Sequence, residues 1–184
     1  MTTSIDPRPL TGEPLSLELL NTRWRSGGSI RDLLAEEDGL ALWLGSAGLA
    51  DRCPATEASL TALLRAREAL AAAVLDPAAP SPRARAALNS VLAHARLRRE
   101  LTPSGPVSRV EPQDPSWLAA WLAVDDYLGL LQSTPDRIRH CAGEHCVLHF
   151  FDTSQNGRRR WCSMATCGNR NKASRHYART RTQA

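Results

Sequence analysis

The stretches CAGEHC at residues 141–146 and CSMATC at residues 162–167 place four cysteines in two pairs near the C-terminus. Four residues separate the cysteines of each pair, and fifteen residues separate the two pairs. A tetrahedral zinc ion needs four soft donors, and thiolates collected as two local pairs require little ordering of the chain. The pairs therefore predict one structural zinc ion with four ligands: Cys141, Cys146, Cys162 and Cys167.

Two disulfides are the alternative for these cysteines, and the expected compartment decides between the two. Residues 1–20 carry prolines and both signs of charge, without the apolar core of a signal peptide. No stretch approaches the roughly 18 apolar residues that a membrane span needs. We therefore expect a cytoplasmic chain, in a reducing milieu that favours metal binding. His140, His145 and His149 are alternative ligands, although four cysteines already complete the shell.

The segment between the cysteine pairs predicts a β-hairpin. Val147–Phe151 is a short apolar run of strand type, and Asn156-Gly157 is a turn signal before Arg158–Arg160. The chain beyond the second cysteine pair lacks proline as far as Arg179, which favours a helix. We therefore expect a zinc knuckle, then a hairpin, then the second cysteine pair leading into a helix.

Charge divides the chain near Arg137. The whole chain has 23 basic and 19 acidic side chains, a formal net charge of +4. Residues 137–184 hold ten arginine and lysine residues against two acidic residues, a net charge of +8. Residues 1–136 carry 13 basic against 17 acidic side chains, a net charge of −4. An acidic body with a basic tail predicts a polyanion as partner, most often nucleic acid for an intracellular protein.

The same change predicts two domains, at residues 1–134 and 137–184. The first is long enough to bury a core, whereas the second has few apolar residues and needs the zinc ion as a staple. The expected fold class is α+β and mainly helical: a helical N-terminal domain with a small β-hairpin or sheet, followed by the zinc module. Helices are predicted in four places: residues 35–47, after the N-cap Thr56, after Ser81-Pro82, and after Asp114-Pro115.

Strand signals in the body are weaker. Leu15–Leu19 alternates with polar residues in the way of a half-buried strand, and residues 29–34 can return as its partner. Three prolines and a glycine interrupt residues 101–112. We therefore expect a loop there, with at most a short strand at 107–110.

Candidate nucleic-acid contacts lie on the hairpin arm and on the predicted helix. Arg158, Arg159 and Arg160 can bind phosphates without sequence preference. Asn169 and Arg170 have side chains that can read base edges in the major groove, or that can brace the zinc knuckles through hydrogen bonds. Further basic residues would ring the helix: Lys172, Arg175 and Arg179.

The run from Trp161 to Arg170 resembles the signature of the CGNR zinc-finger proteins, named for the residues at 167–170. The first cysteine pair, followed by Phe150-x-Asp152-Thr153-Ser154, is similar to the first half of that finger. Residues 14–22, 32–34 and 42–44 resemble the ABATE domain that usually precedes it. The resemblance covers nearly the whole chain. It implies a treble-clef-like zinc module in a bacterial stress-induced transcription regulator, whose N-terminal domain is proposed to sense a signal.

Three functions compete. We expect a nucleoid-associated, DNA-binding transcription regulator, whose body senses a small molecule or forms a homodimer, without a membrane partner. An RNA-binding zinc-finger protein is the first alternative, because arginine-rich modules also bind A-form RNA. An enzyme with its active site in the helical domain is the second. No catalytic residue stands out, because nucleotide-binding and hydrolase motifs are absent and adjacent Asp125 and Asp126 point about 100° apart on a helix.

Overall fold

The computed structural model describes residues 6–172 of the chain. The α-helices are α1 (Leu15–Leu20), α2 (Gly39–Ser46), α3 (Glu57–Ala73), α4 (Pro82–Leu92) and α5 (Leu118–Ser133). The strands are β1 (Arg23–Ser26), β2 (Ser29–Asp32), β3 (Ala95–Thr102), β4 (Gly105–Pro112), β5 (Ile138–His140) and β6 (His149–Phe151). Short helical turns are η1 (Leu33–Ala35), η2 (Pro115–Trp117), η3 (Pro135–Arg137) and η4 (Met164–Gly168). None of the helices in the described part is long and apolar enough to cross a membrane.

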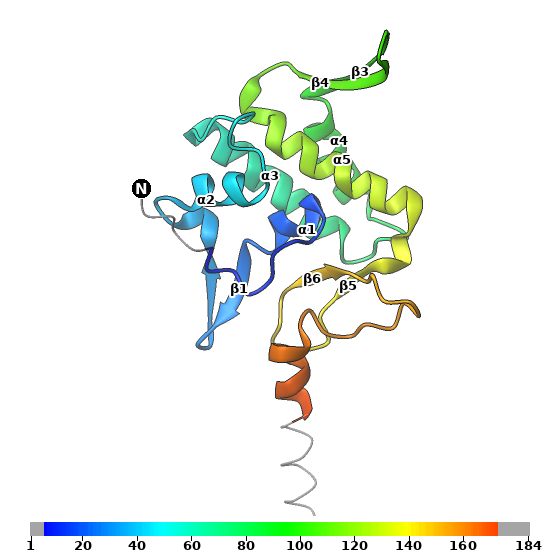
Figure 1. The fold of residues 1–184 in the computed structure, drawn as a ribbon. Coiled ribbons are helices and arrows are strands. Elements are labelled where there is room, and N and C mark those ends of the chain that lie inside the picture. The colour runs from blue at the N-terminus through cyan, green and yellow to red at the C-terminus, as the bar shows by residue number, and fades with distance from the viewer. Residues whose placement is uncertain (1–5, 173–184) are drawn as a thin grey trace, which may run out of the picture.

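The strands form three separate antiparallel pairs, β1 with β2, β3 with β4, and β5 with β6. Figure 1 shows the helices in the middle of the molecule, with the β3–β4 hairpin projecting at one end and the C-terminal module at the other. The α+β, mainly helical fold class is therefore confirmed, although the body holds two small sheets, β1–β2 and β3–β4, where one was predicted.

The three long helices begin near the caps that the sequence predicts. Thr56 accepts a hydrogen bond from the backbone N–H of Ser59 at the start of α3, and Ser81 caps α4 in the same way. Asp114 caps η2, which runs directly into α5. These side chains satisfy backbone donors that the first turn of a helix leaves without a partner.

The core lies where α3 and α5 pack against each other, with α1 and α4 packed beside them. Leu63 and Leu70 on α3 and Val124 on α5 are fully buried. Trp43 and Trp121 are also buried, and each donates its indole N–H to a backbone carbonyl. Helical spacing predicts Trp43, Trp117 and Trp121 as core residues. The first and last are buried, whereas Trp117 is only partly buried.

Residues 15–20 form the helix α1, so the strand predicted from the alternating leucines is wrong. The alternation misleads because the polar positions Ser16 and Glu18 are buried as well. Ser16 donates its backbone N–H and its hydroxyl to Asp126 on α5, at 2.9 and 2.6 Å. Glu18 pairs with Arg8 at 2.6 Å. In a hydrophobicity pattern, a polar residue counts as exposed even when a hydrogen-bond partner allows it to be buried. The pattern of residues 15–20 therefore did not reveal a helix buried on all sides.

The loop predicted over residues 101–112 is also wrong. The strands β3 and β4, of eight residues each, form a hairpin paired from Ala95↔Pro112 to Thr102↔Gly105. Hydrogen-bonded and non-hydrogen-bonded pairs alternate along an antiparallel hairpin, and the prolines of β4 occupy non-hydrogen-bonded positions. The backbone N–H of Gln113 donates to His94, which makes the next pair, Ala95 with Pro112, a non-hydrogen-bonded one. Pro106 lies six residues away and shares that parity, so neither proline removes a ladder hydrogen bond.

The predicted hairpin of the C-terminal module has a different second strand. Residues 149–151 pair with β5 before the first cysteine pair, and the segment after Asn156-Gly157 is not a strand. Gly157 does lie in a turn, with φ of +59°. Arg137 fills the space beside it, because its guanidinium donates to the carbonyls of Asp152 and Ser154. The hydrogen bonds of Arg137 therefore fix the loop after β6, where a second strand of the hairpin was predicted.

Candidate metal centre and basic surface

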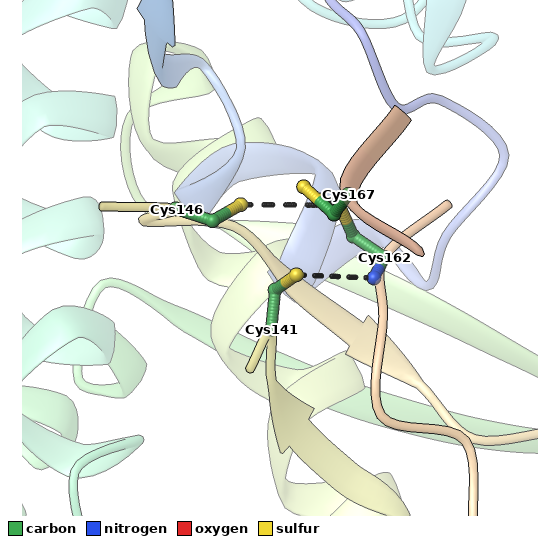
Figure 2. A group of neighbouring side chains, drawn as sticks. All are labelled: Cys141, Cys146, Cys162 and Cys167. Atoms are coloured by element: carbon green, nitrogen blue, oxygen red, sulfur yellow. Dashed lines mark hydrogen bonds between the residues drawn. The ribbon is translucent and has the colours of Figure 1, made fainter. Parts of the chain in front are cut away.

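The four paired cysteines converge at one point of the C-terminal module (Figure 2). Cys141 follows β5 and Cys146 precedes β6, so the knuckle between them lies at the tip of that hairpin. Cys162 lies in the loop before η4, and Cys167 lies within η4. The four sulfur atoms all lie within 4.8 Å of one another.

The sulfur positions fit a tetrahedral zinc ion. A Zn–S bond of about 2.3 Å places the sulfurs of a regular tetrahedron about 3.8 Å apart. The sulfurs of Cys146 and Cys162 are 3.9 Å apart, and those of Cys162 and Cys167 are 3.6 Å apart. A closed set of four thiolates leaves no position for water, so zinc bound here supplies structure rather than catalysis.

Backbone donors and neighbouring thiols favour the thiolate form at Cys141. Its sulfur accepts the N–H of Cys162 at 3.3 Å and that of Gly143 at 3.4 Å. Hydrogen bonds from the thiols of Cys146 and Cys162 lower the pKa of Cys141. The hydrogen bond between Cys146 and Cys141 in turn raises the pKa of Cys146 to about 12. A divalent cation replaces those shared protons and allows all four sulfurs to be thiolates at once.

Two glycines allow the chain to pass close to the sulfurs. A Cβ at Gly143 would lie 3.1 Å from the sulfur of Cys167 and 3.2 Å from the Cβ of Cys146. A Cβ at Gly168 would lie 2.8 Å from the sulfur of Met164. Met164 is an exposed, flexible side chain that can move aside, so the close approach is tighter at Gly143 than at Gly168.

The histidines near the site do not join the ligand set. Among the described residues, the cluster that could hold a metal contains the four cysteines alone. The ring of His149 lies 4.9 Å from that of His140, and burial lowers the pKa of His149 to about 4. His145 lies in the knuckle with φ of +62° and its ring is 3.5 Å from Glu144. The structure therefore favours the four-cysteine set over a histidine replacement.

Arg159 is half-buried and its side chain bonds to the backbone around the second cysteine pair. Its Nε donates to the carbonyl of Trp161 at 2.9 Å, and its terminal nitrogen donates to the carbonyl of Cys162. The guanidinium lies 4.3 Å over the ring of Phe150 and 3.7 Å from Glu13. This arginine, predicted as a phosphate contact, thus already has partners in the second cysteine pair, in β6 and in the body.

Asp152 organises the turn that leads to Arg159. It is buried, and it accepts the N–H and the hydroxyl of Ser154 at 2.9 and 2.6 Å, and the backbone N–H of Arg159 at 2.9 Å. Burial raises the pKa of this carboxyl, but the three donors outweigh it and the pKa lies below its ordinary value. The Asp-Thr-Ser run of the sequence therefore has a structural role.

Arg158 and Arg160 have a different environment from Arg159. Both are exposed, whereas Arg159 is half-buried, and all three line a hollow of about 390 Å³ whose wall also includes Ser163 and Met164 at the start of η4. The guanidinium of Arg160 lies 5.2 Å over the ring of Trp161. Two exposed arginines therefore border a concave surface beside η4, the helical turn that contains Cys167.

The other predicted contacts lie on the continuation of η4. Asn169, Arg170 and Lys172 are exposed, and the side chain of Asn169 donates to the carbonyl of Ala165 at 3.4 Å within its own turn. Arg170 lines a small hollow beside the knuckle, without a hydrogen bond to it among the residues that the structure describes. Base reading and knuckle bracing by Asn169 and Arg170 both stay predictions. Arg175 and Arg179 lie outside the described residues.

Two body residues that attach the module were not predicted. Asn21 is buried, donates its side-chain amide to the carbonyl of His149 at 2.8 Å, and accepts the N–H of the same residue at 2.9 Å. Glu13 accepts the N–H of Phe151 at 2.7 Å. Together they satisfy the edge of β6 that faces away from β5. No local sequence signal marks such pairs, because the partners lie more than 120 residues apart.

Comparison with known families follows the same division of the chain. A family profile described as "Putative stress-induced transcription regulator", the ABATE family, matches residues 13–133. A second profile, described as "CGNR zinc finger", matches residues 137–180. A search of curated proteins found no match. Because the first profile covers well over half of the sequence, the chain belongs to the ABATE family and carries a CGNR zinc finger at its C-terminus.

Proposed function

We propose that this protein is a DNA-binding transcription regulator, whose zinc-stapled C-terminal module docks on duplex DNA. The family match supports a regulatory role and a zinc finger. Neither matched family is an enzyme type, and we propose no catalytic role. The four-thiolate site has no open position, and Asp126 is engaged by Ser16 as a structural acceptor.

The observation that carries the proposal is the pair of exposed arginines, Arg158 and Arg160, beside the hollow of about 390 Å³. They belong to a segment of net charge +8 attached to a body of net charge −4, so the field of the molecule orients this end toward a polyanion. Phosphate contacts from such arginines position a protein on DNA without reading sequence. Sequence preference then falls to the helix that carries Asn169 and Arg170.

The body has the second part of the proposed function. We infer that residues 1–134 form a domain that senses a small molecule or brings two copies of the chain together. A single small module buries a modest DNA surface, so a dimer that reads two half-sites supports specific binding.

The test compares duplex DNA with a structured RNA hairpin, in competition at one fixed salt concentration, using zinc-loaded full-length protein. We expect duplex DNA to win, and we expect the double variant R158A/R160A to lose affinity for all duplex sequences. The slope of log K against log salt should decrease in magnitude by roughly 0.9 for each lost phosphate contact. Arg52→Ala, at an exposed position of the body, is the matched control and should keep the slope of the unmodified protein.

Preference for the RNA hairpin would move the assignment to the RNA-binding alternative. Equal loss of affinity in R158A/R160A and in Arg52→Ala would show that contacts to nucleic acid do not centre on this surface, and would overturn the proposal.

A further inference from the structure

A cleft of about 550 Å³ lies in the body and is lined by body residues alone, with residues of α3 and α4 in its walls. This volume falls within the range of small-molecule sites in proteins. The cleft exists because the facing positions of the two helices carry short side chains. Ala69 on α3 and Ala84 on α4 are buried in its floor together with Val91. The floor is therefore apolar and preformed by the packing of two capped helices.

Two stacked rings form part of the wall. His94 and Trp117 have ring centroids 3.4 Å apart and planes inclined by 7°. Their backbones are fixed, since the N–H of His94 donates to Val91 and the N–H of Trp117 donates to Asp114. Unlike Trp43 and Trp121, Trp117 is only partly buried, and it presents aromatic surface to the cleft. A flat aromatic wall above an alanine floor suits a planar apolar ligand.

Arginines from both helices complete the lining. Arg65 on α3 and Arg83 on α4 are exposed, and the guanidinium of Arg65 lies 5.9 Å from the ring centre of Trp117. No carboxylate in residues 6–172 forms an ion pair with either of them, whereas the buried Arg8 pairs with two carboxylates and the buried Arg67 with one. Guanidinium groups without a carboxylate partner are well suited to bind the carboxylate of a ligand.

The charge around the cleft argues for a small ligand rather than nucleic acid. Residues 1–136 carry a net charge of −4, and the carboxylate of Glu68 also lines the cleft. A DNA backbone laid across this face would meet the negative charge of the whole body, whereas a small anion in the cleft meets two arginines and the single carboxylate of Glu68.

We infer that this cleft binds a small planar aromatic carboxylate. Its ring lies on the Ala69 and Ala84 floor against Trp117, and its carboxylate pairs with Arg65 and Arg83. The inference rests on the sensing role proposed for the body, to which it adds a ligand class and a site.

The experiment uses zinc-loaded full-length protein and isothermal titration with 1-naphthoate, in parallel with the neutral 1-naphthamide. We expect naphthoate to bind and naphthamide to bind at least tenfold more weakly, because the neutral amide cannot form charge-assisted bonds to the two guanidinium groups. Arg83→Ala should weaken naphthoate binding about tenfold or more. Ala87→Leu, which fills the cleft from a helix position, should abolish binding while the circular dichroism spectrum stays unchanged.

Arg85→Ala is the matched control, since Arg85 lies on the same helix, donates to the carbonyl of Pro80 and does not line the cleft. It should bind naphthoate within about twofold of the unmodified protein. Failure of naphthoate to bind, or equal binding of naphthoate and naphthamide, overturns the inference. So does full affinity in Arg83→Ala.

A separate titration with duplex DNA distinguishes this inference from the proposed function. Naphthoate binding without DNA binding would support the ligand site and contradict the proposed DNA-binding function. DNA binding without naphthoate binding would support the proposed function and contradict the ligand site. If Arg83→Ala weakens duplex binding while naphthoate is not bound, the arginines contact phosphate and the cleft assignment is wrong.

Discussion

Three consecutive arginines, at positions 158, 159 and 160, have different environments and should respond differently to mutation. Arg159→Ala removes hydrogen bonds to the carbonyls of Trp161 and Cys162 and the contact with Glu13. We expect it to lower the free energy of unfolding by about 1–3 kcal/mol, and to speed the release of zinc to a chelator. Thermal unfolding and the rate of zinc transfer to a colorimetric chelator measure both effects.

Arg158→Ala is the internal control for that variant, because Arg158 is exposed and lacks these contacts. It should leave stability and zinc release unchanged while weakening DNA binding. A protein in which Arg159→Ala keeps its zinc as firmly as Arg158→Ala would contradict the bracing role.

Asn21 offers a second test at the residue scale, because one side chain satisfies both the N–H and the carbonyl of His149. Asn21→Ala leaves two backbone groups without partners in a buried place, at about 1–3 kcal/mol each. We expect a large loss of stability, measured by denaturant unfolding of the zinc-loaded protein. Asn21→Asp can still accept the N–H but cannot donate to the carbonyl, so its loss of stability should be smaller than that of Asn21→Ala.

The difference between foreseen and missed residues has a physical cause. Four cysteines at short, equal spacings carry their own geometry, so the sequence alone predicts the ligand set. The roles of Arg159, Asn21 and Glu13 depend on partners brought together by the fold, and some of those partners are backbone atoms. A backbone carbonyl has no letter in the sequence, so a run of arginines cannot reveal which member of the run turns inward.

At the scale of elements, the β3–β4 hairpin projects from the helices and lacks a third strand (Figure 1). Leu97 and Leu101 are 45% and 86% exposed, and Ala95 at the base is buried. An isolated two-stranded hairpin is only marginally stable. We expect its amide protons to exchange with solvent much faster than those in the middle of α3, as measured by hydrogen–deuterium exchange and mass spectrometry.

Protection equal to that of α3 would contradict this expectation, and would mean that another surface covers the hairpin in solution. Repeating the exchange at two protein concentrations tests whether that surface is a second copy of the chain.

The elements show where sequence patterns succeed and where they fail. Thr56 and Ser81 mark helix starts because a capping side chain acts within three residues. Prolines favour a loop over residues 101–112 unless they fall at positions that do not donate to the neighbouring strand. Only the register of β4 with β3 determines those positions, and the local sequence does not contain it. In α1 the burial of Ser16 depends on Asp126, 110 residues away, and no local window contains that information.

At the scale of the whole molecule, the zinc module and the body share one buried core. Leu148 and Phe150 of the module belong to the same cluster of buried residues as Leu17 on α1 and Val124 on α5. The two-domain division at residues 1–134 and 137–184 stays a prediction, and so does independent folding of the two parts. The contacts require that loss of one part affects the other.

Removal of zinc gives the sharpest test of this coupling. Without the ion, the four cysteines lose the metal bonds that join the two pairs, and the module of residues 137–172 should lose its fold while the body stays helical. The body then exposes the surface that Phe150 and Leu148 covered, at about 1.5–3 kcal/mol for each large apolar side chain. We therefore expect the chelated protein, and a chain of residues 1–134, to melt about 10 °C or more below the zinc-loaded protein. Calorimetry should show one transition for the zinc-loaded protein and the same lowered midpoint for the other two samples. A body that melts at the same temperature with and without zinc would mean that the shared core contributes nothing to its stability.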